Sequence, residues 1–75
     1  MDIYRNLGGD SGVVAYEIES DSIKVKFRDG WVYIYNYGSA GSGNVDQMKL
    51  LAHAGRGLNS FIRRVVRKAY AAKTR

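Results

Sequence analysis

The sequence has no cysteine, no proline and a single histidine among its 75 residues. Without cysteine the chain can form no disulfide, and one histidine is too few for a Cys/His zinc site within one chain. A chain this short lies near the lower limit at which a hydrophobic core alone stabilises a fold. We therefore expect a fold held by side-chain packing, with no cofactor and no metal.

Long apolar runs are also missing. No stretch of the sequence approaches the ~20 apolar residues of a membrane-spanning helix, and residues 1–9 lack the basic and apolar regions of a secretory signal. These absences predict a cytoplasmic protein that does not contact a membrane.

Residue combinations that indicate a reaction are scarce. His53 is not accompanied by a G-x-S-x-G motif or by a pair of carboxylates. We interpret it as an exposed residue near the C-terminus of a helix, where a partial positive charge is favourable. We expect the protein not to be an enzyme.

Acidic residues are rare in one part of the chain. Residues 1–30 carry four basic and six acidic side chains, whereas residues 31–75 carry eight basic and one acidic. The net charge of +5 therefore belongs to the C-terminal half. Such asymmetry suggests a polyanionic partner or an anionic surface.

Three segments between residues 12 and 37 have the composition of β-strands. The first alternates from Gly12 to Glu19, with Val14, Tyr16 and Ile18 on one face, and the polar segment 19–22 makes a tight turn. Apolar and basic residues then alternate over residues 23–28, and an aromatic, β-branched run follows Gly30. We predict a three-stranded antiparallel β-meander over residues 12–37.

The turn at Asp29 and Gly30 decides which face of the second hairpin is open. A two-residue turn would create an aromatic and basic face on which bases stack, formed by Lys24, Lys26, Trp31, Tyr33 and Tyr35. A three-residue turn, with Gly30 in the left-handed conformation, moves the register by one residue. It places Tyr33 and Tyr35 in the core and leaves Lys24, Lys26, Val32 and Ile34 on the open face. We favour the three-residue turn.

The glycine- and serine-rich segment 38–43 predicts a mobile loop because of its low-complexity composition. It lacks the Gly-Lys-Ser/Thr ending of a phosphate-binding loop. Asn44 then predicts a helix cap, with Gln47 three residues later. The apolar side of this first helix contains Val45, Met48, Leu51 and Ala52.

A second helix is predicted from Leu58 to Tyr70, after Gly55 and Gly57 end the first through a positive φ. At ~100° per residue, one arc of this helix is apolar and contains Leu58, Phe61, Ile62, Val65, Val66 and Ala69. The whole chain then reads as an α+β fold, a three-stranded meander followed by two helices packed on one face. Residues 1–11 are an unassigned arm, 12–70 the single domain and 71–75 a basic tail.

Several of these segments resemble the KTSC domain, a family named for its occurrence at the C-terminus of some lysyl-tRNA synthetases. The resemblance covers roughly residues 11–70 and rests on two motifs. F-x-x-G-x-x-Y-x-Y runs from Phe27 to Tyr35, and G-x-x-x-N-x-x-I-R runs from Gly55 to Arg63. The resemblance implies three strands with two helices, no established reaction, and association with RNA through the synthetase link.

The opposite arc of the second helix is basic, and cations on one exposed side of a helix can follow a phosphate backbone. We predict a non-catalytic binding module that contacts nucleic acid, RNA before DNA. The alternative is protein–protein interaction or homodimerisation without a nucleic-acid role. The candidate contact residues are Arg56, Arg63, Arg64, Arg67, Lys68 and Lys73.

Overall fold

The computed structural model describes residues 1–9 and 11–75. Within these residues the elements follow in the order β1 (Asp2–Ile3), β2 (Val13–Glu19), β3 (Ser22–Phe27), β4 (Val32–Asn36), α1 (Tyr37–Ala40), α2 (Ser42–Ala54), α3 (Leu58–Phe61), the π-helical turn η1 (Ile62–Val66) and β5 (Ala72–Thr74).

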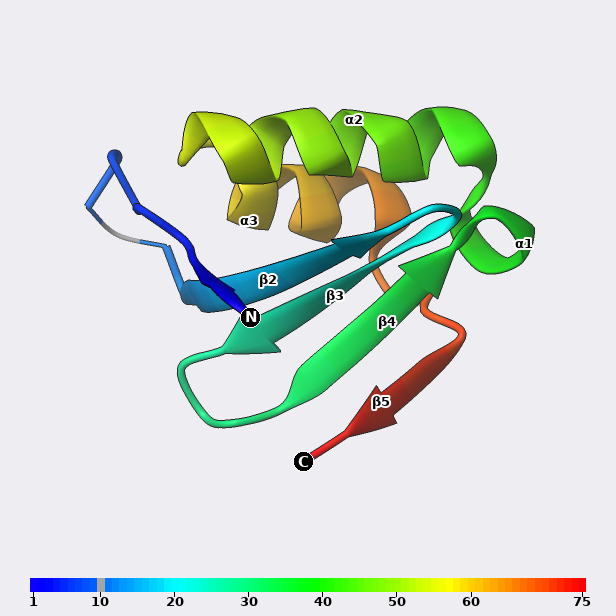
Figure 1. Cartoon of the computed structure of the whole chain (residues 1–75), viewed down its shortest axis with the longest axis horizontal. Helices are drawn as coiled ribbons and strands as arrows, with labels where there is room; N and C mark the ends of the chain where they lie inside the picture. Colours follow the sequence, from blue (N-terminus) through cyan, green and yellow to red (C-terminus); the bar gives the residue numbers. More distant parts are fainter. Residues whose placement is uncertain (10) are drawn as a thin grey trace.

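The strands of the described residues form one antiparallel sheet in the order β1-β2-β3-β4-β5. Helices α2 and α3 lie across one face of this sheet, and the chain termini lie at its two edges (Figure 1). The α+β class is confirmed, but the predicted strand number is wrong because five strands are present, not three.

The two additional strands come from the segments predicted as arm and tail. Asp2 lies opposite Tyr16, and Thr74 lies opposite Val32. Strands of two and three residues are too short to show a periodic pattern, so the sequence carries no signal for them. They form because the outer edges of β2 and β4 expose unpaired backbone N–H and C=O groups, and the N-terminal and C-terminal segments lie close enough to pair with them.

The β3–β4 hairpin has the predicted three-residue turn. Phe27 N–H donates to the Trp31 carbonyl, and Gly30 N–H donates to the Phe27 carbonyl, each at 2.9 Å. Gly30 has φ of 94°, a conformation that L side chains rarely adopt. Val25 lies opposite Tyr33 and Ile23 opposite Tyr35, which confirms the favoured register and contradicts the two-residue alternative.

Strict alternation fails in β2 because the strand contains a β-bulge. Val13 lies opposite Phe27 but Ala15 lies opposite Lys26, so Val14 has no partner of its own. The extra residue allows both Val13 and Tyr16 to be buried beneath the helices. The prediction of Val14, Tyr16 and Ile18 on one face therefore does not hold for Val14.

The glycine-rich segment after β4 is helical, so the predicted mobile loop is wrong. Asn36 caps α1, because its Oδ1 accepts from Ser39 N–H at 2.7 Å while Ser39 Oγ accepts from Asn36 N–H at 3.1 Å. Gly41, with φ of 91°, then separates α1 from α2. Asn44 lies inside the first turn of α2 and donates to the Ala40 carbonyl, so its predicted role as the cap is also wrong.

The apolar side of α2 agrees with the prediction. Val45, Met48 and Ala52 are buried and Leu51 is half-buried, whereas Leu50 is 65% exposed. Gly55 ends the helix in the left-handed conformation with φ of 76°.

The helix predicted to reach Tyr70 ends at Val66 and finishes as a π-helix. Arg67 N–H donates to the Ile62 carbonyl, the i to i+5 bond of a π-helix. The wider turn buries Leu58, Ile62 and Val66 at intervals of four residues and leaves Val65 49% exposed. Val65 therefore does not belong to the core, because the ~100° step assumed for an α-helix does not apply there.

The core fills the space between the helices and the covered face of the sheet. Both the sheet and the helices contribute fully buried side chains to this core. The largest of them are Val13, Ile23, Val25, Tyr35, Val45, Met48 and Leu58.

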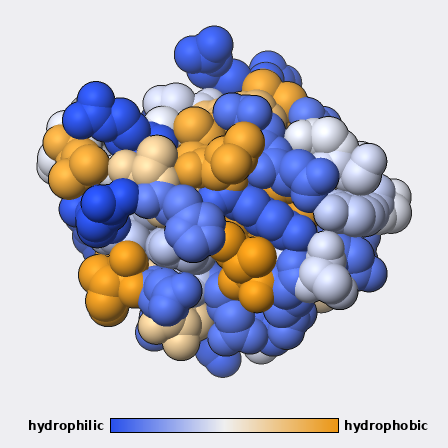
Figure 2. Space-filling view, turned by 45° about the horizontal axis from the view of Figure 1, so that its top comes forward, coloured by the Kyte–Doolittle hydropathy of each residue, from blue (hydrophilic) through white to orange (hydrophobic). Residues whose placement is uncertain are grey.

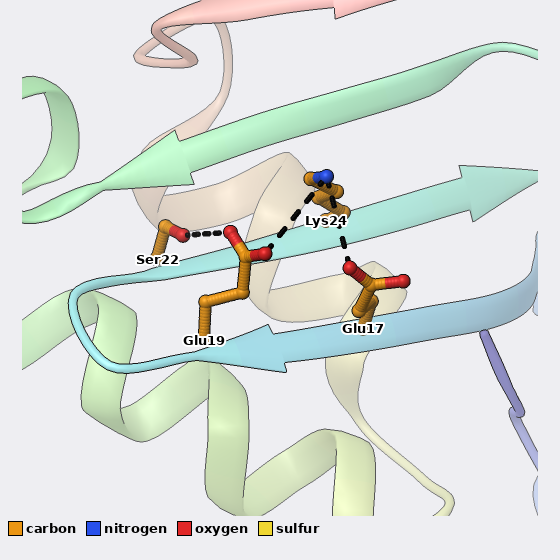
Figure 3. A network of polar contacts seen from close by, with 4 residues as sticks. All are labelled: Glu17, Glu19, Ser22 and Lys24. Carbon is orange, nitrogen blue, oxygen red and sulfur yellow. Dashed lines mark hydrogen bonds and ion pairs between the residues drawn. The ribbon is translucent and has the colours of Figure 1, made fainter.

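The uncovered face of the sheet carries a network of charged side chains. Lys24 Nζ lies 3.7 Å from Glu17 Oε2 and 4.0 Å from Glu19 Oε2, and Ser22 Oγ donates to Glu19 at 3.1 Å. Figure 3 shows Lys24 reaching between the two carboxylates of the neighbouring strand. The positive charge of Lys24 is thus balanced within the sheet.

Candidate functional site

Three arginines lie on and just before the short helix formed by α3 and η1. Arg56 is in the turn that follows α2, while Arg63 and Arg64 are in η1, and all three are exposed. Gly55 and Gly57 place Arg56, since both have a positive φ, and an added Cβ at Gly55 would lie 2.9 Å from Arg5 Cβ. The tight approach of the N-terminal arm therefore requires glycine at position 55.

Arg56 and Arg63 share a pocket of about 150 Å³ between the N-terminal arm and α3. None of the described residues around it is acidic, and most carry hydrogen-bonding side chains. The lining residues are Tyr4, Asn6, Gly8, Ser11, Arg56, Gly57, Asn59, Ser60 and Arg63.

The arm that forms one wall of this pocket is held by hydrogen bonds to the helical layer. Leu7 N–H donates to the Gly55 carbonyl at 2.7 Å, and Leu58 N–H donates to the Tyr4 hydroxyl oxygen at 3.3 Å. Arg5 donates to the His53 carbonyl. These hydrogen bonds therefore hold the arm, and with it one wall of the pocket, against the helical layer.

Several donors in the pocket remain available. Tyr4 is only 4% exposed, and its hydroxyl group uses an oxygen lone pair, not its proton, in the bond from Leu58 N–H. Asn6 Oδ1 accepts from Ser11 N–H at 3.1 Å, which leaves the amide NH₂ group of Asn6 as a donor. The wall of the pocket is thus rich in donors and suits a ligand with several acceptor oxygens.

Further hollows continue from this pocket along the helix. Ser60, Arg63 and Arg64 line one of about 350 Å³. Arg64 also lines a groove of about 290 Å³ with the apolar side chains of Leu51, Phe61 and Val65. The structure therefore brings Arg56, Arg63 and Arg64 onto one continuous surface, which we call the arginine surface.

The other predicted contact residues are placed differently. Arg67 and Lys68 are exposed just after η1, outside these hollows. Lys73 lies in β5, at the opposite edge of the sheet from β1, with its Nζ 5.1 Å from the centre of the Trp31 ring. Arg75 lies over the same ring at 5.0 Å. Lys73 therefore belongs to a cation–π cluster around Trp31 and not to the arginine surface.

The alternative aromatic and basic face is contradicted by the register. Tyr33 and Tyr35 lie on the helix-covered face of the sheet, opposite to the one that carries Lys24 and Lys26. Tyr35 is fully buried, and the Tyr33 ring packs 4.9 Å from that of Tyr70. The five residues Lys24, Lys26, Trp31, Tyr33 and Tyr35 consequently do not form one stacking platform.

The carboxylates, His53 and the helices of residues 1–9 and 11–75 bear on two other kinds of site, for a metal and for a membrane. No three His, Asp or Glu side chains of these residues gather closely enough to hold a metal ion. None of the helices in this part of the chain has the length and apolarity needed to cross a membrane. His53 is exposed, and its ring contacts Tyr16 edge-on at 6.1 Å.

Sequence reasoning missed the contribution of the N-terminal arm. Tyr4, Asn6 and Ser11 line the pocket, but they lie 45 or more positions from Arg56 in the sequence and share no motif with it. Comparison of the chain with protein-family models, curated proteins and solved structures gives no match.

Proposed function

We propose that this protein is a non-catalytic binding module that contacts nucleic acid through the arginine surface, with Arg67 and Lys68 extending the contact. The observation that carries the proposal is the continuity of Arg56, Arg63 and Arg64 around hollows whose described lining residues include no carboxylate. Guanidinium groups bind phosphate oxygens in a bidentate manner, so such a surface suits a phosphate backbone.

The apolar side chains of this helix argue against a lipid surface. Leu58, Ile62 and Val66 are buried in the core and cannot insert into a bilayer. A polyanion that needs only the polar side of the helix fits better. RNA is favoured over DNA by the resemblance to the KTSC domain.

Fluorescence anisotropy with a labelled single-stranded RNA, repeated over a range of salt concentrations, tests this proposal. Each phosphate contact adds about 0.7 to the slope of log K against log salt for a single strand, so losing three lowers the slope by about 2. We expect this decrease in slope for the triple variant Arg56→Gln/Arg63→Gln/Arg64→Gln. The same titration with duplex DNA shows which of the two nucleic acids binds more tightly.

The matched control removes three cations elsewhere, in the variant Lys26→Gln/Lys73→Gln/Arg75→Gln. These residues lie on the uncovered sheet face or in the C-terminal segment. If both triple variants weaken binding equally, net charge and not the arginine surface is responsible, and the proposal fails. Far-UV circular dichroism confirms that both variants are folded.

Self-association is the second candidate, because Leu50 and Val65 are 65% and 49% exposed. With the helical side turned forward, however, Figure 2 shows apolar side chains in separate patches divided by hydrophilic ones. Large contiguous apolar patches are typical of interfaces between proteins. Light scattering tests this candidate. A molecular mass that rises with protein concentration in the parent protein, but stays at the monomer value in Val65→Ser, would favour self-association.

A further inference from the structure

We infer that the pocket between the N-terminal arm and α3 binds a single phosphate group. The inference rests on the proposed nucleic-acid contact, since it names the chemical group that enters the pocket and the residues that hold it. It concerns the residues around Arg56 and Arg63, and not the wider hollow near Arg64.

The charge of the pocket favours an anion over a cation or a neutral ligand. Two guanidinium groups line it, with no acidic side chain among the described lining residues. The ion pairs found in the described residues involve Lys24 and Lys49, so the charges of Arg56 and Arg63 are not balanced by a carboxylate of residues 1–9 or 11–75. An oxyanion between the two arginines would supply that balance.

The neutral donors select a tetrahedral oxyanion over a simple halide. Tyr4 O–H and the Asn6 NH₂ group remain free to donate from the arm, while Asn59 and Ser60 add an amide and a hydroxyl group from α3. Donors therefore come from both walls. A phosphate group has enough acceptor oxygens to engage both walls at once, whereas chloride has a single centre.

The size of the pocket agrees with this ligand. Its volume of about 150 Å³ is several times the ~30 Å³ that one water molecule occupies in the liquid. The space is therefore sufficient for one phosphate group.

Nuclear magnetic resonance with ¹⁵N-labelled protein and inorganic phosphate tests the inference, with ionic strength held constant by sodium chloride. We expect saturable shifts of the amide signals of Gly57, Asn59 and Ser60. Arg63→Gln should weaken phosphate binding about tenfold or more, the effect of losing a hydrogen bond to a charged group. Asn59→Asp, which places a carboxylate in the pocket, should abolish it.

Arg64→Gln is the matched control for this titration, because it removes the same charge one residue away and outside the pocket. It should bind inorganic phosphate as the parent protein does. If inorganic phosphate causes no saturable shift at the pocket, or if Arg63→Gln and Arg64→Gln weaken its binding equally, the inference is overturned. Salt-dependent RNA binding that persists in that case leaves the proposed function standing.

The source of the phosphate is resolved with one RNA sequence bearing either a 5′-phosphate or a 5′-hydroxyl. Tighter binding of the phosphorylated strand, lost in Asn59→Asp, assigns the pocket to a terminal phosphate. If the two strands bind with equal affinity, and Asn59→Asp lowers both affinities, the pocket is assigned to an internal phosphodiester. Saturable phosphate binding without any RNA binding supports the pocket and refutes the nucleic-acid function.

Discussion

The hydroxyl group of Tyr35 donates a hydrogen bond to the backbone carbonyl oxygen of Arg67 at 3.1 Å. Tyr35 lies in β4 and is fully buried, while Arg67 is the residue at which η1 ends, with φ of 45°. A side chain of the β3–β4 hairpin therefore fixes the end of the helix that carries Arg63 and Arg64.

Stability should depend on pH through this tyrosine. Burial, with smaller contributions from Tyr33 and Tyr70, raises the pKa of Tyr35 from 10.0 to about 12. Because the folded pKa exceeds the unfolded value, the neutral phenol stabilises the fold fully below about pH 10, and this contribution is lost as pH rises through 12. We expect the free energy of unfolding, measured with urea, to fall over that range.

Tyr35→Phe has no phenol proton to lose and should show a shallower fall with pH. Tyr37→Phe serves as the control, because its hydrogen bond to Asp46 also raises the pKa of Tyr37 but the side chain is exposed. Solvent screening weakens its effect on stability. The same pH profile for Tyr35→Phe and the parent protein would refute this role of Tyr35.

The π-helical turn predicts that alanine substitutions at two adjacent valines lower the free energy of unfolding by different amounts. Val66 is 3% exposed and Val65 is 49% exposed. Val66→Ala should lower the free energy of unfolding by about 2 kcal/mol, because it removes buried methyl groups and leaves a cavity, and Val65→Ala by less than about 0.5 kcal/mol. Chemical denaturation measures both, and equal losses would indicate a regular α-helix in this region.

Glycine at position 55 is required both by its conformation and by its neighbour. Gly55→Ala should lower the free energy of unfolding more than Gly30→Ala, although both glycines have a positive φ. An added Cβ at position 30 would have no atom within 4 Å, whereas one at position 55 would lie against Arg5. The shared conformational penalty is roughly 1–2 kcal/mol. Faster amide hydrogen exchange at Leu7 in Gly55→Ala alone would show that the arm has been displaced; unchanged exchange there would contradict the contact.

The cap of α1 should contribute to stability more than the side chain of Asn44. Asn36→Ala removes an N-cap and should cost about 1 kcal/mol. Asn44→Ala loses one hydrogen bond to Ala40 but gains helix propensity, so its cost should be smaller. Thermal melting compares the two variants, and the reverse order would restore Asn44 as the cap.

Much of the fold is visible in local patterns. Alternation over residues 23–28, together with Asp29 and Gly30, predicts the hairpin but leaves two registers open, and the structure has the favoured one, in which Val25 lies opposite Tyr33. The spacing of Val45, Met48 and Ala52 predicts the buried side of α2. The exposure of Arg63 and Arg64 is likewise visible, because helical spacing places both on the polar side of the second helix.

The sequence by itself determined the hairpin, the two helical segments and the basic character of the second, because each depends on residues close together in the chain. Only the tertiary structure decided that the ends join the sheet, that η1 widens and exposes Val65, and that Tyr4 and Asn6 meet Arg56 and Arg63 in one pocket. These features depend on backbone pairing and packing between distant segments. Short segments such as β1 and β5 carry no periodic signal of such contacts, so the pocket appears only when the chain is folded.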